Sequence, residues 1–224
     1  MAELVDATDL KSVGGDSVRV RIPPAAFRTL KKEEKMIALG VIDIQNDFAH
    51  PKGNLYVKDG EKIVPQVEEL LKLARRNKKV VFFSLDIHSN PDPEFEKWPP
   101  HCIGGTWGVE LFEPLEIKKE DIVIIKGSFQ YSAFASGILD LILKERKIKG
   151  IILVGLAFDF CVGETALDGI KRDFKVWIVR ECSKAVKLEN FKDKKNSEKV
   201  MEERLKKAGV KLISFKLAKE LLSG

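Results

Sequence analysis

Short apolar runs alternate with longer amphipathic stretches over most of this 224-residue chain. Each run is bounded by charged or turn-forming residues, which is typical of a strand buried on both faces of a sheet. The runs predict six strands, at residues 36–44, 79–88, 121–127, 150–157, 175–182 and 211–215.

Helical periodicity fills the intervals between these runs. It predicts helices at 60–78, 133–147, 162–173 and 197–208, and a short one at 218–222. In the helix at 133–147 we expect Phe134, Ile138, Leu141 and Ile142 on one face. The alternation predicts a three-layer αβα, Rossmann-like α/β fold with a central, mainly parallel six-stranded sheet. No G-x-G-x-x-G follows the first strand, so a dinucleotide site has no support.

Two segments do not follow this pattern. Residues 1–35 have no sustained period and contain Ile22-Pro23-Pro24, which breaks a helix or central strand. We expect them to be a disordered or wrongly assigned extension, with Met36 as the true start and 36–224 as a single domain. The second segment, 89–115, is rich in Pro, Gly and Trp, and a loop of that length in a compact domain is usually functional.

Composition and charge exclude several classes of function. No apolar run is long enough to span a membrane, and the N-terminus lacks the apolar core of a signal peptide. The net charge is +5, but Lys and Arg alternate with Asp and Glu, so we expect neither a nucleic-acid nor a membrane partner. Three cysteines without a spaced framework predict free thiols in a reducing, cytoplasmic compartment.

Residues capable of chemistry follow four of the predicted strands. They are Asp43, the pair Asp86 and His88, Lys126, and Cys161. Ligands of such a sheet bind beyond the carboxyl ends of its strands, where these side chains meet. Cys161 lies where a strand passes into a helix, and that setting and Lys126 are expected to lower its pKa. A nucleophile, a base and a cation together predict covalent catalysis on a carbonyl group.

Each of these residues also has an ordinary structural interpretation. Asp43 alone is more often a turn or helix cap, and Lys126 alone is more often a solvated side chain. Cys161 alone is more often an inert buried thiol. Their coincidence at the strand ends favours a catalytic site.

A second group of potential ligands surrounds the end of the second strand. Asp86 and His88 point to the same face of a strand, and Glu94 and His101 follow in the long loop. Carboxylate and imidazole ligands suit zinc, iron or manganese, of which zinc is our first expectation. Asp92 competes with Glu94 as a ligand, and the alternative is a pair of surface histidines in a loop.

Aromatic residues occur in the same regions of the sequence. Phe48 follows Asp43, Trp98 precedes His101, and Tyr131 follows Lys126. We expect Phe48 and Trp98 to enclose a flat ring, whereas Phe134 is expected to serve in ordinary packing.

These motifs, taken together, resemble one family. The matching segments are VIDIQNDF (41–48), LDIH (85–88), WPPHCIGGTWG (98–108), IIKG (124–127), YSAF (131–134) and GLAFDFCV (155–162). The chain resembles nicotinamidases, also called pyrazinamidases, of the isochorismatase-like cysteine hydrolase superfamily. The sharpest match is WPPHC, and Phe158 departs from the pattern because threonine is common at that position.

The resemblance implies a role for each matched residue. Asp43, Lys126 and Cys161 would be the catalytic triad, and the N–H groups of Ala157 and Cys161 would form the oxyanion hole beside a cis Leu156–Ala157 peptide. The implied metal ligands are Asp86, His88, His101 and, at the variable fourth position, Glu94. The substrate ring would lie against Phe48 and Trp98, with Tyr131 nearby.

The expected activity is metal-dependent hydrolysis of nicotinamide to nicotinic acid and ammonia through a thioester, in NAD salvage. Pyrazinamide is an expected second substrate, and a homo-oligomer is compatible with the family. The alternatives are another amidohydrolase or isochorismatase of the superfamily, a metallohydrolase in which Cys161 is incidental, and a non-catalytic small-molecule or redox sensor.

Overall fold

A single twisted sheet forms the centre of the molecule. The computed structural model describes residues 36–189 and 196–224, so the expectation for residues 1–35 lies outside the described residues. The strands are β1 (Ile37–Ile42), β2 (Val80–Asp86), β3 (Ile122–Lys126), β4 (Gly150–Leu156), β5 (Lys175–Lys184) and β6 (Lys211–Ile213). Their order is β3-β2-β1-β4-β5-β6, and every neighbouring pair is parallel. The predicted α/β fold is confirmed, and the sheet is entirely parallel.

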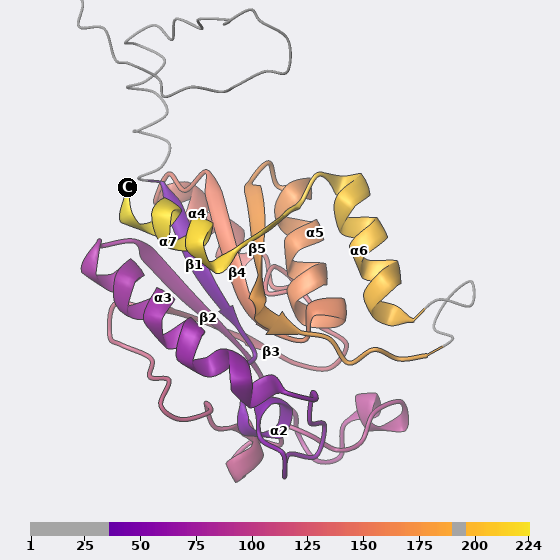
Figure 1. Cartoon of the computed structure of the whole chain (residues 1–224). Helices are drawn as coiled ribbons and strands as arrows, with labels where there is room; N and C mark the ends of the chain where they lie inside the picture. The colour runs from indigo at the N-terminus through magenta and orange to yellow at the C-terminus, as the bar shows by residue number, and fades with distance from the viewer. Residues whose placement is uncertain (1–35, 190–195) are drawn as a thin grey trace, which may run out of the picture.

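Helices cover both faces of the sheet, which explains the almost uninterrupted apolar runs in β1 and β4. The helices are α2 (Asn46–Ala49), α3 (Val64–Arg76), α4 (Ile138–Glu145), α5 (Gly163–Lys171), α6 (Ser197–Ala208) and α7 (Phe215–Ser223). Helices α3 and α7 pack on one face, and α4, α5 and α6 contribute to the core on the other (Figure 1). No helix in the described part of the chain is long and apolar enough to cross a membrane.

The prediction for the helix at 133–147 is wrong in its start and in its buried face. Helix α4 begins only at Ile138, because Gly137 has a φ of +73°, outside the right-handed helical region. Leu139 and Leu143 are the buried side chains, whereas Ile138 is 55% exposed and Leu141 is 70% exposed. Phe134 is buried from a turn ahead of the helix, where its ring stacks on that of Phe174.

The end of the chain also differs from the prediction. Strand β6 stops at Ile213 rather than at residue 215, and α7 starts at Phe215 rather than at 218. The reason is Ser214, whose hydroxyl accepts a hydrogen bond from Leu217 N and caps the helix.

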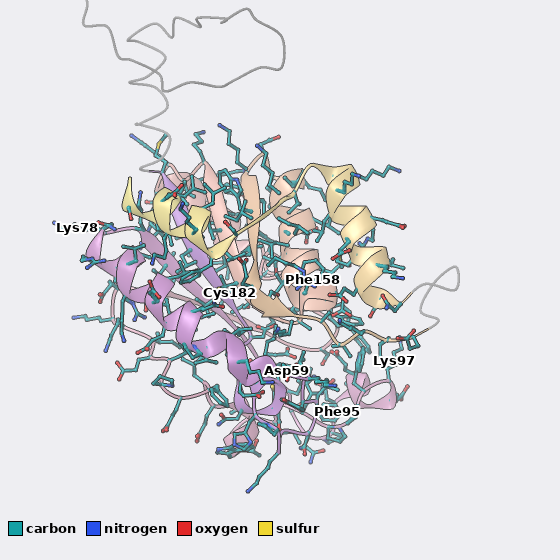
Figure 2. The ribbon with its side chains drawn as sticks, viewed as in Figure 1. Asp59, Lys78, Phe95, Lys97, Phe158 and Cys182 are labelled. Atoms are coloured by element: carbon teal, nitrogen blue, oxygen red, sulfur yellow. The ribbon has the colours of Figure 1, made fainter. Side chains whose placement is uncertain are left out.

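The strand order reverses direction at one point in the sheet. β1 lies beside both β2 and β4, so the crossovers leave it on opposite sides, and a crevice forms beyond the carboxyl ends of β1 and β4. In Figure 1 this end of the sheet faces α2. Figure 2 shows Asp59, Phe95 and Lys97 from the connecting loops at the same end, whereas Lys78 lies at the opposite one.

Candidate active site

Asp43 directly follows β1 and is fixed by the neighbouring strand β2. Its N–H donates to Ser84 O over 3.1 Å, and the Ser84 hydroxyl donates to Asp43 Oδ1 over 2.7 Å. The carboxylate is completely buried at the carboxyl end of the sheet. Its other oxygen, Oδ2, is therefore held toward the space between β1, β3 and β4, where Lys126 pairs with it.

Cys161 follows β4 in a tight turn. The Leu156–Ala157 peptide is cis, as the resemblance implies. The chain then makes a π-helical turn, Phe158–Val162, in which Phe160 N and Val162 N both donate to Ala157 O over 3.1 Å. The nucleophile candidate therefore sits inside this turn, directly ahead of α5, rather than on the first residues of a regular helix.

Lys126 joins Asp43 and Cys161 into one group. Its Nζ is 2.8 Å from Asp43 Oδ2 and 3.6 Å from Cys161 Sγ, and it donates to Gln130 O over 3.1 Å. It is also 3.9 Å from Asp86 Oδ1, because Asp86 and Lys126 are register partners at the ends of β2 and β3. The residues predicted from four strand ends thus meet around one buried ammonium group.

The charges in this group differ from the expectation for Cys161. Burial raises the pKa of the Cys161 thiol well above its usual value, and the charge of Lys126 lowers it only in part. Hydrogen bonding to Asp43 raises it further. Lys126 lowers the pKa of Cys161 as predicted, but the prediction that the site favours the thiolate is wrong, because desolvation outweighs the cation. Burial also raises the pKa of Asp43, against the lowering effect of Lys126.

Asp86, His88 and His101 converge beside the triad candidates. Asp86 Oδ2 lies 3.1 Å from His88 Nε2 and 3.4 Å from His101 Nε2, and all three side chains are buried. One ligand atom from each lies within 4.8 Å of the others. Burial lowers the pKa of His88, but hydrogen bonding to Asp86 outweighs it and raises the pKa to about 9. Two imidazoles drawn to one buried carboxylate fit a divalent transition metal, which would replace the protons they share.

Glu94 and Asp92 form a second, overlapping group with His88. Phe129 N donates to Glu94 Oε2 over 2.5 Å, and Glu94 also borders the pocket described next. Asp92 Oδ2 is 3.1 Å from His88 Nδ1, on the side of the ring away from Asp86. Of the two carboxylates predicted as alternative ligands, only Glu94 borders the pocket. Direct metal ligation by Glu94 stays a prediction.

A pocket adjoins both groups of candidate residues. Phe48, Trp98 and Tyr131 all line it, as predicted for ring contacts. Trp98 Nε1 lies 3.3 Å from the Tyr131 hydroxyl, which accepts its hydrogen bond. Asp86, His101, Ala157 and Cys161 also line it, so an apolar ring site and the chemical groups share one cavity.

Several residues that shape the site were not predicted. Phe160 lines the pocket, and the Trp98 ring meets it edge-on at a centroid distance of 5.3 Å. Val186 lines it from beyond β5, and Gln45 bonds both the N–H and the carbonyl of Asp86. Phe160 and Gln45 lie inside the motifs GLAFDFC and VIDIQNDF, which was a usable signal. Val186 carries no such signal, because only the fold brings it to the pocket.

Phe158, the departure from the family pattern, does not face this pocket. Its side chain is fully buried in the core cluster that includes Ala166 and Leu167 of α5. The Arg180 guanidinium lies 4.5 Å above the ring, and Arg180 also donates to Ser183 O. The larger side chain is thus accommodated in the core rather than in the pocket.

Comparison with known proteins shows which family the chain belongs to. The isochorismatase domain family matches residues 37–213, which include all six strands and every site residue named above. The chain belongs to the isochorismatase family. Relatives named nicotinamidase or pyrazinamidase place it among the family's hydrolases of amide C–N bonds.

Individual relatives support the same placement. The nicotinamidase of Acinetobacter baylyi is 30% identical over 182 residues, which cover 69% of this chain and 84% of that protein. The zinc complex of the Pyrococcus horikoshii pyrazinamidase has 29% identity and a TM-score of 0.70, covering 80% of this chain and 99% of that one. The nicotinate complex of PnC1 from L. infantum has 29% identity and a TM-score of 0.66, covering 81% and 93%.

Proposed function

We propose that this enzyme hydrolyses nicotinamide to nicotinic acid and ammonia, and that it also cleaves pyrazinamide. The observation that carries the proposal is one pocket bordered by Cys161, by the Asp86 and His101 pair and by aromatic rings. The zinc-bound pyrazinamidase and the nicotinate-bound relative support it. The cellular role would be NAD salvage in the cytoplasm, and a homo-oligomer stays a prediction.

Asp43 and Cys161 perform the first chemical step. Asp43 takes the thiol proton as the sulfur attacks the carboxamide carbon, which avoids a resting thiolate in a site where burial disfavours one. Lys126, 2.8 Å from Asp43 and 3.6 Å from the sulfur, stabilises the negative charge as it passes between them. The N–H groups of Ala157 and Cys161 hold the oxyanion of the tetrahedral intermediate.

The remaining steps return the enzyme to its starting state. Protonated Asp43 gives its proton to the departing nitrogen, so ammonia leaves and a thioester to Cys161 remains. Asp43 then takes a proton from water as the water oxygen attacks the thioester carbon. The sulfur leaves as thiolate and recovers the proton, and nicotinic acid is released.

Asp86, His88 and His101 would hold a divalent transition metal, with Glu94 at a fourth position. A metal held there would supply Lewis acidity toward the ring nitrogen of the substrate. Zinc is the first expectation and iron or manganese the alternatives, because a donor set of imidazole and carboxylate suits all three. Phe48, Trp98 and Tyr131 enclose the ring.

Ammonia release from nicotinamide tests the proposal, together with metal analysis of the purified protein. Wild type is expected to release ammonia and to contain zinc, iron or manganese. Cys161→Ala should abolish release, and His88→Ala should lower it strongly and reduce the metal content. Release retained by Cys161→Ala would leave a metallohydrolase with an incidental thiol. Nicotinamide binding without turnover of any amide by metal-loaded wild type would instead favour a sensor.

A further inference from the structure

The loop after the catalytic-lysine strand is bonded to the loop that carries the metal-ligand candidates. Ser128 Oγ donates to Asp92 Oδ2 over 2.5 Å, and Phe129 N donates to Glu94 Oε2 over 2.5 Å. In the same turn, Gln130 O accepts a hydrogen bond from Lys126. Residues 126–130 therefore bond to the carboxylates of Asp92 and Glu94 on one side, and the carbonyl of Gln130 holds Lys126 of the triad on the other.

Asp92 occupies a central position in this connection. Its side chain is buried, and Oδ1 accepts a hydrogen bond from Glu94 N over 2.8 Å. Oδ2 accepts from Ser128 and lies 3.1 Å from His88 Nδ1. Both carboxylate oxygens therefore have partners from the protein, and neither is directed into the pocket, which Asp92 does not line.

The two nitrogens of His88 have different neighbours. Nε2 faces Asp86 and the shared centre with His101, whereas Nδ1 faces Asp92. A carboxylate accepts hydrogen bonds, so Asp92 keeps a proton on Nδ1 and leaves Nε2 as the free ligand atom. Carboxylate partners of this kind set the orientation and basicity of metal-bound histidines.

We propose that Asp92 is a positioning residue that fixes His88 for metal binding, and that Ser128 in turn fixes Asp92. This inference rests on the proposed metal site. In this inference Asp92 contacts the proposed ligand His88 without binding the metal itself. The turn after Lys126 holds Asp92 in position through Ser128. A change in Ser128 should therefore reach the metal through two hydrogen bonds.

Zinc and cobalt affinities, measured by chelator competition on metal-free full-length protein, test the proposal. Asp92→Ala should weaken binding by about 10–100-fold while the stoichiometry stays at one, and it should alter the visible spectrum of bound cobalt. Asp92→Asn keeps an acceptor for Nδ1 and should lose less. Ser128→Ala should fall between wild type and Asp92→Ala. Glu96→Gln, at an exposed carboxylate of the same loop, is the matched control and should bind as wild type does.

Circular dichroism and urea unfolding show whether each variant is folded, and Asp92→Asn and Ser128→Ala decide the matter if Asp92→Ala does not fold. Folded Asp92 and Ser128 variants that all bind zinc with wild-type affinity would overturn the proposal. Two equivalents of zinc in wild type and one in Asp92→Ala would also overturn it, because Asp92 would then be a ligand. Wild type that binds no metal would refute the metal site itself. That result is distinct from unchanged affinity in the variants and from a changed stoichiometry.

Discussion

At the scale of residues, the candidate site is arranged around the buried ammonium group of Lys126. Lys126 is 2% exposed and contacts Asp43, Cys161 and, at a longer distance, Asp86. Burial lowers its pKa, but the charge of Asp43 and its other neighbours outweigh burial and raise the pKa above its usual value. Lys126 therefore stays charged, and in the proposed mechanism the thiol and the carboxylate beside it exchange a proton.

The thiol of Cys161 should behave as a high-pKa group in the resting enzyme. Since burial raises its pKa well above the usual value, the thiolate fraction grows only as the pH rises past about 9. We expect the rate of iodoacetamide labelling at Cys161, followed by peptide mass spectrometry, to keep increasing above pH 9. A labelling rate that reaches its plateau below pH 8 would mean that a thiolate is already present.

Lys126→Met should reduce both activity and stability. The substitution leaves Asp43 buried without its cation, and breaking a buried pair in this way costs about 3–5 kcal/mol. The folded pKa of Asp43 then rises further above its unfolded value of about 3.9, so the carboxyl becomes neutral in acid. Stability tied to a raised pKa is present at low pH and is lost as the pH rises through the folded value. The loss of unfolding free energy caused by Lys126→Met should therefore be smaller at pH 5 than at pH 8.

Urea unfolding at both pH values, with ammonia release as the activity readout, checks this expectation. Lys144→Met is the matched control, because Lys144 is 54% exposed and pairs with Asp140 on the surface of α4. Its loss should cost no more than about 1 kcal/mol and leave activity unchanged. Equal losses for the two variants would contradict the role assigned to Lys126.

At the scale of elements, the buried strands were predictable and their flanking turns less so. Each strand appears near its predicted place because a parallel strand buried on both faces needs an apolar run. Helix α4 was misplaced because the sequence pattern does not show that Gly137 adopts a positive φ or that Leu139 faces the core. The meeting of Asp43, Lys126 and Cys161 followed from the strand ends, but the raised pKa of the thiol did not, since it depends on burial in the folded chain.

Gly155 on β4 is a position where an added side chain would collide with the backbone of β1. Its φ is +122°, and a Cβ placed there would lie 2.1 Å from the carbonyl oxygen of Ile42 on β1. Gly155→Ala should therefore destabilise the fold by at least about 2 kcal/mol and push apart the strands that carry Asp43 and Cys161, with a loss of activity.

Gly209→Ala is the control that separates the effect of backbone strain from the effect of a steric clash. Gly209 has a φ of +87° with nothing within 4 Å of the added carbon, so it has the backbone strain alone. Its substitution should cost about 1 kcal/mol with activity intact. Thermal unfolding and ammonia release measure both variants, and a Gly155→Ala enzyme as stable and active as Gly209→Ala would contradict the close approach of β1 and β4.

At the scale of the whole molecule, the site is a consequence of strand order. The reversal between β1 and β4 opens the crevice, and β2 and β3 extend the same edge with Asp86 and Lys126. Six strands are covered by helices on both faces, while the loops at this edge supply several of the metal-ligand candidates and the aromatic rings of the pocket. We therefore expect occupancy of the site to affect the stability of the fold.

Metal binding should raise the unfolding temperature of the whole molecule. A ligand held only by the folded state stabilises it by about 2.7 kcal/mol at 100 times its Kd, which corresponds to roughly 5–10 °C for a domain of this size. We expect zinc to raise the Tm of metal-free wild type and a chelator to reverse the rise, as followed by circular dichroism. The single variants His88→Ala and His101→Ala each remove one of the three buried donors, and zinc should raise their Tm only slightly. Metal binding to the cysteines of the unfolded chain affects these variants and wild type equally, because all of them have the same cysteines. An equal rise in Tm in the variants would therefore place the stabilising metal at another site.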